Sequence, residues 1–518
     1  MNEAYDIAVV GSGFGGSLLA MIAHQLGRSV ILLEKNKHPR FAIGESSTPL
    51  SNILLEGLAT RYDLPRITPL SKWGSWQQSY PQVACGLKRG FTFYHHTLGA
   101  PGTSDPDRQR QLLVAASPHD RIADTHWYRA EVDHLFVKET QRIGVEYVDE
   151  VTLQSVSESD KEILLQGRRN NEEFSIRAQF IVDATGPRGF LHRALALEEL
   201  ALPDFPATQA LFNHFTGVGR FGEQMTDHAS EPPPYPVDDA AVHHVFDGGW
   251  VWVLQFNNGI TSAGVAATDD LAMRLRLSEG AAAWQRLLDL IPALKNQFAN
   301  SRAIQPFIHM PRVSFRSSQV AGKRWALLPS AAGFVDPLLS TGFPLTLLGV
   351  SRLAEIIERD WEKPEFAGSL ESYALQTDKE LVAAAELIGA LYATMDRFPT
   401  FAALSMLYFA AASFSEAARR LGKTNLAASF LLHDDSQFGT AMRRCFRHAK
   451  NNCTQREKDG LAAEVRKAIE PINIAGLGNP ERRNWYPVDA NDLLNSAAKL
   501  QSTKDEISQL LDRCGFWN

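Results

Sequence analysis

Residues 5–35 read YDIAVVGSGFGGSLLAMIAHQLGRSVILLEK, and this stretch decides the fold class. It opens on a short β-branched run, residues 17–27 have a helical pattern, and RSVILLEK at 28–35 is a second apolar run. Strand, helix and strand in this order predict a parallel sheet with a right-handed crossover.

Three glycines give the first turn the spacing of a nucleotide-binding loop. Gly11, Gly13 and Gly16 follow the pattern G-x-G-x-x-G. They allow a tight turn, a close approach of the backbone to a pyrophosphate, and close helix–strand packing. Glu34 ends the second strand at the offset expected for binding ribose hydroxyls. A tight turn without ligand is the alternative. GVGRFG at 217–222 has the same glycines but no helical pattern after it, so we interpret it as a loop.

The composition is that of an ordinary soluble protein. Of 518 residues, 44% are hydrophobic and 21% charged, and the net charge of −7 comes without the basic stripe of a nucleic-acid-binding protein. The four cysteines form no CxxC pair, which indicates a reducing compartment. No basic leader is visible, and the apolar residues 401–414 are too few to span a bilayer. We expect a soluble cytoplasmic protein without a transmembrane segment.

Hydrophobic patterns predict the remaining elements. Helices are expected at about 50–62, from about 130, and at about 278–299, and the chain is mainly helical from 351. Strands are expected at 151–156, 162–166, 174–182, 241–246, 250–256 and 260–266.

Two further segments favour FAD over NAD as the nucleotide. FIVDATGPRG at 180–189 resembles the second strand-end motif of FAD-dependent monooxygenase-like proteins, which implies that Asp183 and Gly186 bind the cofactor. GFVDPLLSTG at 333–342 resembles their third motif, in which Asp336 lies near the flavin ribityl chain.

Four segments, in this order, resemble flavin-dependent halogenases. The resemblance is closest to the branch that chlorinates pyrrole and phenol rings, including the halogenases of the pyrrolnitrin pathway, and it covers about the first 350 residues. The segments are HPRFAIGESSTP at 38–49, GLKRGFTF at 86–93, HHVFDGGWVWV at 243–253 and GFVDPLLSTG at 333–342.

The resemblance implies which residues contact the cofactor and which handle the oxidant. Gly44, Glu45 and Ser46 match a flavin-contacting segment, and Arg129 matches a cofactor contact at a helix start. In these enzymes reduced FAD, oxygen and halide give hypohalous acid, which travels through a tunnel to a lysine. Lys88 matches that lysine. Taken without the resemblance, Lys88 is interpreted as a surface residue, since lysine is rarely buried.

The resemblance also implies a halide site. Chloride or bromide is expected against the backbone N–H groups of Thr341 and Gly342, where a small anion nest is plausible. Leu339 stands where tryptophan halogenases carry a glutamate, which argues against free tryptophan as the substrate.

Trp250 and Trp252 are two positions apart on an expected strand, so both indoles point to one face. In the family, W-x-W-x-I-P lines the tunnel beside the flavin and keeps substrate away from it. Here Leu254 and Gln255 replace the usual isoleucine and proline. Core packing alone is the other interpretation of the two tryptophans.

The predicted fold class is α/β, an FAD-binding Rossmann-type domain with an inserted β-sheet substrate region and a helical C-terminal region. We expect FAD-binding parts at 1–195 and 306–355, a substrate-covering sheet at 196–305, and the helical region at 356–518.

The expected activity is halogenation of an electron-rich aromatic or heteroaromatic small molecule. Reduced FAD is the cosubstrate and comes from a separate reductase, because no second dinucleotide site is visible. A flavin-dependent aromatic monooxygenase and a flavin-binding relative without halogenase activity are the alternatives. The pairs His95–His96 and His243–His244 do not complete a metal site, because neighbours on a strand point to opposite faces.

Overall fold

The strand–helix–strand unit predicted at the start of the chain is confirmed. The structure is a computed structural model that describes residues 4–101, 105–224, 231–450 and 455–517. In it β1 (Ala4–Val10) pairs in parallel with β2 (Val30–Leu33) and with β10 (Glu172–Asp183), and α1 (Phe14–Gln25) connects β1 to β2.

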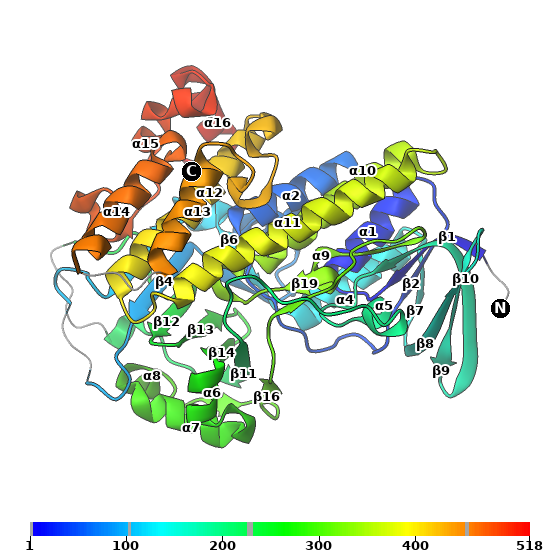
Figure 1. The fold of residues 1–518 in the computed structure, drawn as a ribbon, viewed down its shortest axis with the longest axis horizontal. Helices are drawn as coiled ribbons and strands as arrows, with labels where there is room; N and C mark the ends of the chain where they lie inside the picture. Colours follow the sequence, from blue (N-terminus) through cyan, green and yellow to red (C-terminus); the bar gives the residue numbers. More distant parts are fainter. Residues whose placement is uncertain (1–3, 102–104, 225–230, 451–454, 518) are drawn as a thin grey trace.

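These strands belong to a seven-stranded sheet of order β7-β2-β1-β10-β9-β8, with β18 also paired to β10. β18 is parallel to β10, so the chain returns to this sheet after residue 320. Figure 1 shows the sheet at the end of the molecule that holds the N-terminus. Its other strands are β7 (Glu146–Val148), β8 (Val151–Glu158), β9 (Ile163–Arg169) and β18 (Trp325–Leu327).

A nine-stranded sheet lies at the other end of the molecule (Figure 1). Its order is β15-β11-β14-β13-β12-β4-β5-β20, with β16 paired to β11, so it draws strands from outside 196–305 as well as from within. The strands are β4 (Gly90–His95), β5 (Gln111–Ala115), β11 (Thr208–Thr216), β12 (Ala241–Phe246), β13 (Gly249–Gln255), β14 (Ile260–Thr268), β15 (Arg302–Ala303), β16 (Ile308–Met310) and β20 (Trp485–Tyr486).

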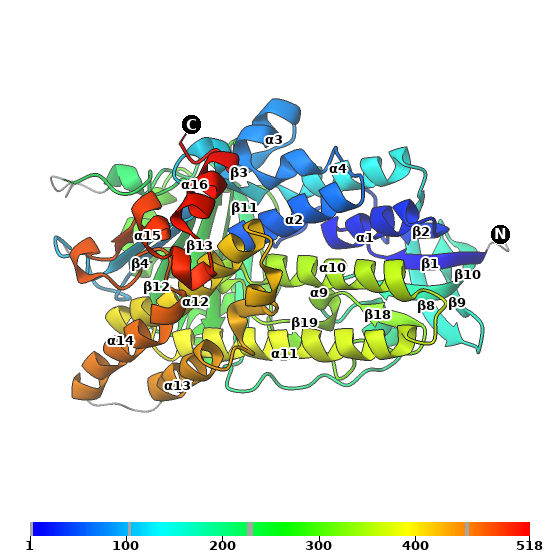
Figure 2. The same ribbon diagram turned by 90° about the horizontal axis from the view of Figure 1, so that it is seen from above.

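Long helices connect the two sheets. Figure 2 shows α10 (Gly342–Asp360) and α11 (Phe366–Tyr392) running side by side along the long axis, and α1 packs against both α10 and α4 (Arg129–Arg142). The C-terminal helices gather over the nine-stranded sheet. They are α12 (Phe398–Arg420), α13 (Phe438–Lys450), α14 (Gln455–Ile469), α15 (Ala490–Asn495) and α16 (Lys504–Arg513).

Short elements complete the fold. Two-stranded sheets are formed by β3 (Cys85–Lys88) with β6 (Asp124–Trp127) and by β17 (Phe315–Arg316) with β19 (Gly333–Phe334). The remaining α-helices are α2 (Pro49–Arg61), α3 (Trp73–Ser79), α5 (Phe190–Ala194), α6 (Asp269–Leu275), α7 (Ala281–Leu290), α8 (Pro292–Gln297) and α9 (Pro329–Ala332).

Two predicted helices have different bounds. The helix expected at 278–299 is broken into α7 and α8, because Pro292 has no N–H to continue the first. The apolar stretch at 401–414 extends into α12, which has 23 residues and by length and hydropathy is able to cross a membrane. In the fold 72% of its most apolar window is buried, as in the core helix of a globular protein.

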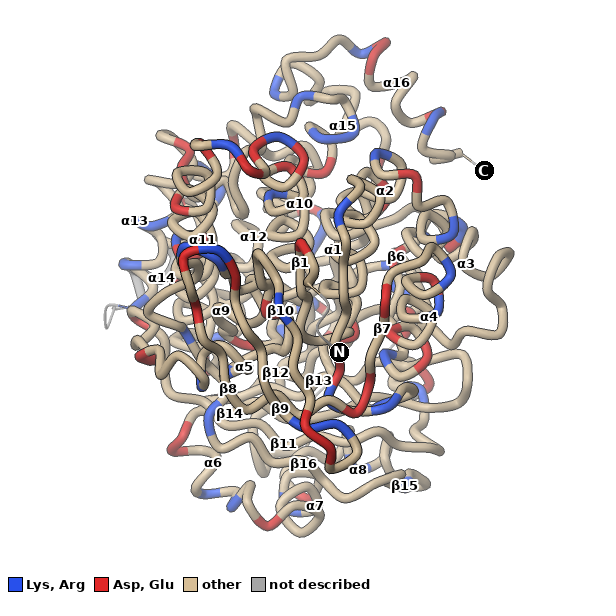
Figure 3. Tube along the Cα trace, turned by 90° about the vertical axis from the view of Figure 1, so that its right-hand side faces the viewer, with Lys and Arg blue, Asp and Glu red and all other residues tan. Residues whose placement is uncertain are grey.

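β13 divides its side chains between two hydrophobic cores, as its alternation predicted. Trp250, Trp252 and Leu254 belong to the main core, whereas Val251 and Val253 belong to a smaller core with α6, α7 and α8. The two indoles therefore point to one face, toward the rest of the molecule. Figure 3 shows positively and negatively charged residues mixed along the chain, which fits the small net charge.

Gly264 on β14 leaves the space that Trp252 fills. A Cβ there would lie 2.3 Å from Trp252 Cζ2 and 2.5 Å from Phe212 Cβ. We predict that Gly264→Ala destabilises the protein by about 1–3 kcal/mol through overpacking. Gly57→Ala is the control, because a Cβ on α2 meets nothing within 4 Å and favours the helix. Urea unfolding checks both, and equal stability of the two variants contradicts the prediction.

Candidate functional site

The three glycines of the first turn have different environments. Gly11 has φ +102°, and a Cβ there would lie 2.7 Å from the backbone of Ala184. At Gly16 a Cβ would lie 2.0 Å from the Gly11 carbonyl oxygen. At Gly13, the N-cap of α1, the nearest atom would be an Arg129 nitrogen at 3.4 Å. Gly11 and Gly16 are thus required by the fold, whereas Gly13 keeps a side of the loop open to a ligand.

Glu34 is held as an acceptor beside this loop. Its Oε2 accepts hydrogen bonds from Ser12 N at 3.1 Å, Ser12 Oγ at 2.7 Å and Arg40 at 3.2 Å. Burial raises the pKa of Glu34, but the Arg40 charge and hydrogen bonds from Asn36 and Ser12 outweigh burial and hold the pKa below its usual value. His38 Nδ1 and Arg40 Nε are buried without a hydrogen-bond partner among the described residues. The ionised Glu34, the unpartnered Arg40 N–H and the open loop fit the adenosine and pyrophosphate of FAD.

Arg129 fixes the Gly44 loop to the start of α4. Its guanidinium binds Asp133 at 2.8 and 2.9 Å and donates to the carbonyl oxygens of Ile43 and Gly44 at 3.0 and 2.9 Å. It also lies 4.9 Å from the centre of the Phe14 ring, next to the glycine loop. Arg129 therefore connects the Gly44 segment to the nucleotide-binding turn, although its five donors are largely used within the protein.

Glu45 forms a buried pair that the sequence analysis missed. Its Oε1 lies 2.7 Å from Nε2 of His214, and the two side chains are 2% and 4% exposed. His214 is on β11 of the nine-stranded sheet, with the rings of Phe41 and Tyr128 at 4.9 and 5.5 Å. A lone histidine in a strand carries no sequence signal, because the partner lies 169 residues away.

Lys88 is fully buried, so its interpretation as a surface residue is wrong. Its Nζ donates to Ser46 Oγ at 2.9 Å and to the Ser47 carbonyl oxygen at 2.5 Å, and it lies 4.0 Å from the centre of the Phe91 ring. Lys88 on β3 lies opposite Asp124 on β6 in the register of the two antiparallel strands. Burial lowers the pKa of Lys88 and raises that of Asp124, and each charge opposes the shift of the other. Burial therefore favours the neutral amine, and the Asp124 carboxylate favours the ammonium.

Asp336 connects Trp250 to the helical region. Asp336 Oδ1 accepts from Trp250 Nε1 at 3.2 Å and from the Leu338 N–H at 2.9 Å, and Oδ2 accepts from the Tyr392 hydroxyl at 2.9 Å. Burial raises the pKa of Asp336 to about 7. Both oxygens therefore have protein partners, and the contact expected between Asp336 and the ribityl chain stays a prediction.

Asp183 shapes the turn around Gly186, and Thr341 and Gly342, the residues expected to bind halide, begin a helix. Asp183 accepts from Thr185 and from the Leu191 N–H, which folds the chain around Gly186, where φ is +85°. Thr341 is the N-cap of α10 and Gly342 its first residue. Just before them Leu339 has φ +62° and Ser340 has φ +55°, an uncommon backbone for residues with a side chain. Cofactor and halide contacts at these positions remain predictions.

The histidines of the two pairs have separate environments. His96 Nε2 lies 2.9 Å from His244 Nδ1, whereas the His243 ring lies between Phe93 at 4.4 Å and Trp250 at 5.2 Å. Within the described ranges, no group of three His, Cys, Asp or Glu side chains is placed to hold a metal ion.

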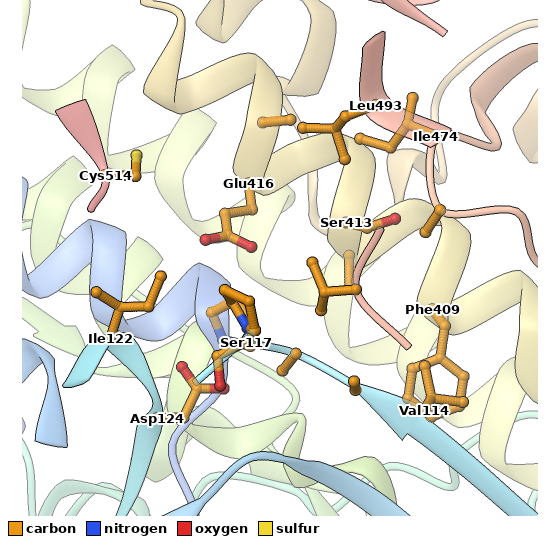
Figure 4. Close-up of a pocket in the computed structure, with 18 of the residues that line it drawn as sticks. Val114, Ser117, Ile122, Asp124, Phe409, Ser413, Glu416, Ile474, Leu493 and Cys514 are labelled. Atoms are coloured by element: carbon orange, nitrogen blue, oxygen red, sulfur yellow. The ribbon is translucent and has the colours of Figure 1, made fainter. Parts of the chain in front are cut away.

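A cavity of about 180 Å³ is lined by Phe91 and Asp124, two neighbours of Lys88. Phe91 forms part of its wall and also covers the Lys88 ammonium. Figure 4 shows Asp124 and Ser117 on one side and Glu416 of α12 across from them. The C-terminal residues close the cavity, among them Ile474, Tyr486, Leu493, Leu511 and Cys514.

The environment of Gly13 leads to a test that separates binding from folding. We predict that Gly13→Leu leaves the unfolding transition of the flavin-free protein nearly unchanged but weakens FAD binding about 100-fold or more, because the side chain occupies the pyrophosphate position. Gly16→Ala is the comparison, because its Cβ would lie 2.0 Å from backbone and should impair the fold itself. Bound-flavin absorbance and thermal unfolding are measured together; a flavin-replete Gly13→Leu protein contradicts the prediction.

Comparison with known proteins identifies the family. A tryptophan halogenase family model matches residues 123–401. The tetracycline 7-halogenase of Kitasatospora aureofaciens is 28% identical over 390 residues, which cover 74% of this chain and 68% of that protein. The monodechloroaminopyrrolnitrin halogenase of Pseudomonas fluorescens is 26% identical over 387 residues, covering 74% of this chain and 66% of that protein. The chain thus spans about two thirds of the length of these relatives.

A solved structure shares the fold over almost the whole chain. The halogenase PltM, crystallised with phloroglucinol and FAD, superposes with a TM-score of 0.82 at 23% identity, over 92% of this chain and 99% of that one. The family match itself runs from β6, opposite Lys88, through both tryptophans and Asp336 into α12. The chain therefore belongs to the tryptophan halogenase family and is a flavin-dependent halogenase that uses FAD and halide.

Proposed function

We propose that the enzyme halogenates an electron-rich aromatic or heteroaromatic ring of the phenol or pyrrole type, with chloride or bromide. The observation that carries this proposal is the burial of Lys88 behind Phe91, which also forms the wall of a cavity. Relatives named for tetracycline, for monodechloroaminopyrrolnitrin and for a carrier-bound pyrrole support the class of ring.

The residues that would hold FAD lie on the first turn, on the Gly44 loop and at the start of α4. When bound in its reduced form, the cofactor supplies the means to convert oxygen and halide to hypohalous acid. The chain contributes Gly13 for the pyrophosphate, Glu34 for the ribose, and Arg129 to hold the Gly44 loop in place. Thr341 and Gly342 would hold the halide at the N-terminus of α10, where backbone N–H groups favour an anion.

Lys88 would orient the oxidant toward the ring. Its ammonium donates hydrogen bonds, and Ser46 and Ser47 fix its position, so hypohalous acid meets a placed donor. The ring carbon forms a bond to the halogen, the halogen–oxygen bond breaks, and the ring proton leaves with the hydroxide as water. Trp250 donates to Asp336, and its ring lies 5.7 Å from the ring of Trp252. The pair of indoles would form a wall of the passage beside the flavin.

A separate reductase that supplies reduced FAD is part of the proposal, since the chain offers one dinucleotide fingerprint in a strand–helix context. The proposal also includes a cytoplasmic location. Cys85, Cys445 and Cys514 form no disulfide bond, which supports a reducing compartment.

Replacing Lys88 tests the proposal directly. We predict that Lys88→Met, which keeps much of the side-chain volume, lowers halogenation by roughly 100-fold or more while FAD affinity stays within about 3-fold, because a positioned donor or acid is lost. Lys138→Met on the exposed face of α4 is the matched control.

The assay follows product mass with reduced FAD, oxygen, halide and a panel of phenols, pyrroles and indoles. A halide-dependent product carrying chlorine or bromine supports the proposal. A halide-independent gain of one oxygen identifies the monooxygenase alternative, and unproductive consumption of reduced FAD with every ring identifies a relative without halogenase activity. Unchanged turnover in Lys88→Met removes the role assigned to the lysine.

A further inference from the structure

Three residues that line one cavity each have a buried polar atom without a hydrogen-bond partner. These atoms are Asp124 Oδ2, Asn52 Oδ1 and Ser117 Oγ, and no described residue provides a partner for any of them. The three side chains are 5%, 3% and 4% exposed. Buried polar groups in folded proteins are almost always paired, so three unpaired atoms on one cavity point to a ligand.

The chemistry of these atoms specifies what the ligand provides. Asn52 donates its amide N–H to Asp124 Oδ1 at 2.7 Å, which leaves its own carbonyl oxygen as an acceptor. In the ionised form of Asp124 the free carboxylate oxygen is also an acceptor, whereas the Ser117 hydroxyl can donate or accept. Two acceptors and one hydroxyl match a group that donates a hydrogen bond and accepts another, as a ring hydroxyl or amino group does.

The other walls of the cavity are apolar or already satisfied. Phe91, Tyr408 and Phe409 line it, and the Tyr408 hydroxyl donates to the Leu339 carbonyl oxygen at 2.9 Å. Glu416, which faces Asp124 across the cavity in Figure 4, accepts from Arg420 at 2.8 Å. The unsatisfied polarity therefore lies on the Asp124 side, and the rest suits an aromatic ring.

We propose that Asp124, Asn52 and Ser117 form a recognition site for a hydroxyl or amino group on the aromatic substrate. This deepens the proposed function and rests on it for the identity of the ring as the reacting molecule. Asp124 pairs across β3 and β6 with Lys88, and Phe91 contacts both the cavity and the ammonium. A ring anchored at Asp124 is thereby held against Phe91, on the side of the oxidant-holding amine. The three side chains are specificity-determining.

Equilibrium binding of phenol and anisole tests the site. The two rings differ in one O–H, which phenol donates to Asp124 Oδ2 and anisole lacks. We expect the enzyme loaded with oxidised FAD to bind phenol about 10-fold or more tightly than anisole, as for a hydrogen bond to a charged group. Ligand-observed NMR at millimolar concentrations measures both dissociation constants without turnover, so the effect of Asp124 on Lys88 does not enter.

Variants assign the preference to individual side chains. Asp124→Asn should reduce the phenol preference to about 3-fold or less, and Ser117→Ala should weaken phenol binding by about 3- to 10-fold. Ser117→Ala also keeps the test valid if the buried Asp124 is needed for folding. Ser405→Ala is the matched control: its hydroxyl is buried on α12, donates to the Phe401 carbonyl oxygen at 2.9 Å, and lies outside the cavity lining. It should change neither constant.

The outcomes separate this inference from the proposed function. Equal binding of phenol and anisole, no measurable phenol binding, or an unchanged preference in both variants overturns the recognition site. Halogenation of phenol and anisole at equal efficiency also overturns the recognition site, but it leaves the proposed function intact. Selective phenol binding that depends on Ser117 and Asp124, in an enzyme that halogenates neither ring, supports the site and refutes the proposed function.

Discussion

The burial of the Lys88 amine is the constraint on which the arrangement of the site depends. Removing an ammonium from water is costly, so the fold must supply partners from several segments at once. Ser46 and Ser47 come from the Gly44 loop, the Phe91 ring from β4, and the opposing carboxylate of Asp124 from β6. Each of these segments also belongs to another part of the molecule, so the amine connects the Gly44 loop to two strands that contribute residues to the cavity lining.

The second connection runs through Asp336, between the end of the nucleotide-binding half and the nine-stranded sheet. Trp250 donates to it from β13 and Tyr392 from the end of α11. Both tryptophan side chains are part of the main core, and both donate a buried hydrogen bond, Trp250 to Asp336 and Trp252 to Ser262. Core packing and the wall function are therefore compatible interpretations of the same residues, because a wall between two chambers is itself densely packed.

Local sequence determined much of the fold in advance. The strand–helix–strand start, the strand pattern at 151–182 and the alternation at 250–254 were readable because each depends on neighbours in the chain. The helix expected at 278–299 was wrong because Pro292 interrupts an otherwise continuous pattern. α12 is longer than the apolar stretch at 401–414 because its boundary signals lie outside that stretch: Pro399 stands in its first turn, and Arg419 and Arg420 in its last.

The site was only partly predictable for the same physical reason. Lys88 and the Gly44 segment stand in recognisable motifs, whereas His214 and Asn52 gain their significance from partners distant in sequence. Ser117 gains its significance because its buried hydroxyl has no partner among the described residues. An isolated serine or histidine is uninformative until the fold shows whether its polar atom has a partner. The motif resemblance implied that Lys88 lies inside the protein, whereas the general rarity of buried lysine predicted a surface position. Only the packing of β3, β4 and β6 shows that Lys88 is fully buried.

The last strand of the nine-stranded sheet has a consequence for how the protein is made. β20 pairs in parallel with β5, and the Arg108 guanidinium lies 3.4 Å from the centre of the Trp485 ring. The edge of β5 is therefore covered by residues that the ribosome adds long after β5 itself. At bacterial or eukaryotic translation speeds the β5 edge waits on the order of tens of seconds for its neighbour. An uncovered edge is a template for pairing with other chains. Recombinant yield should therefore depend on chaperones that shield the nascent chain, and on slow expression at low temperature.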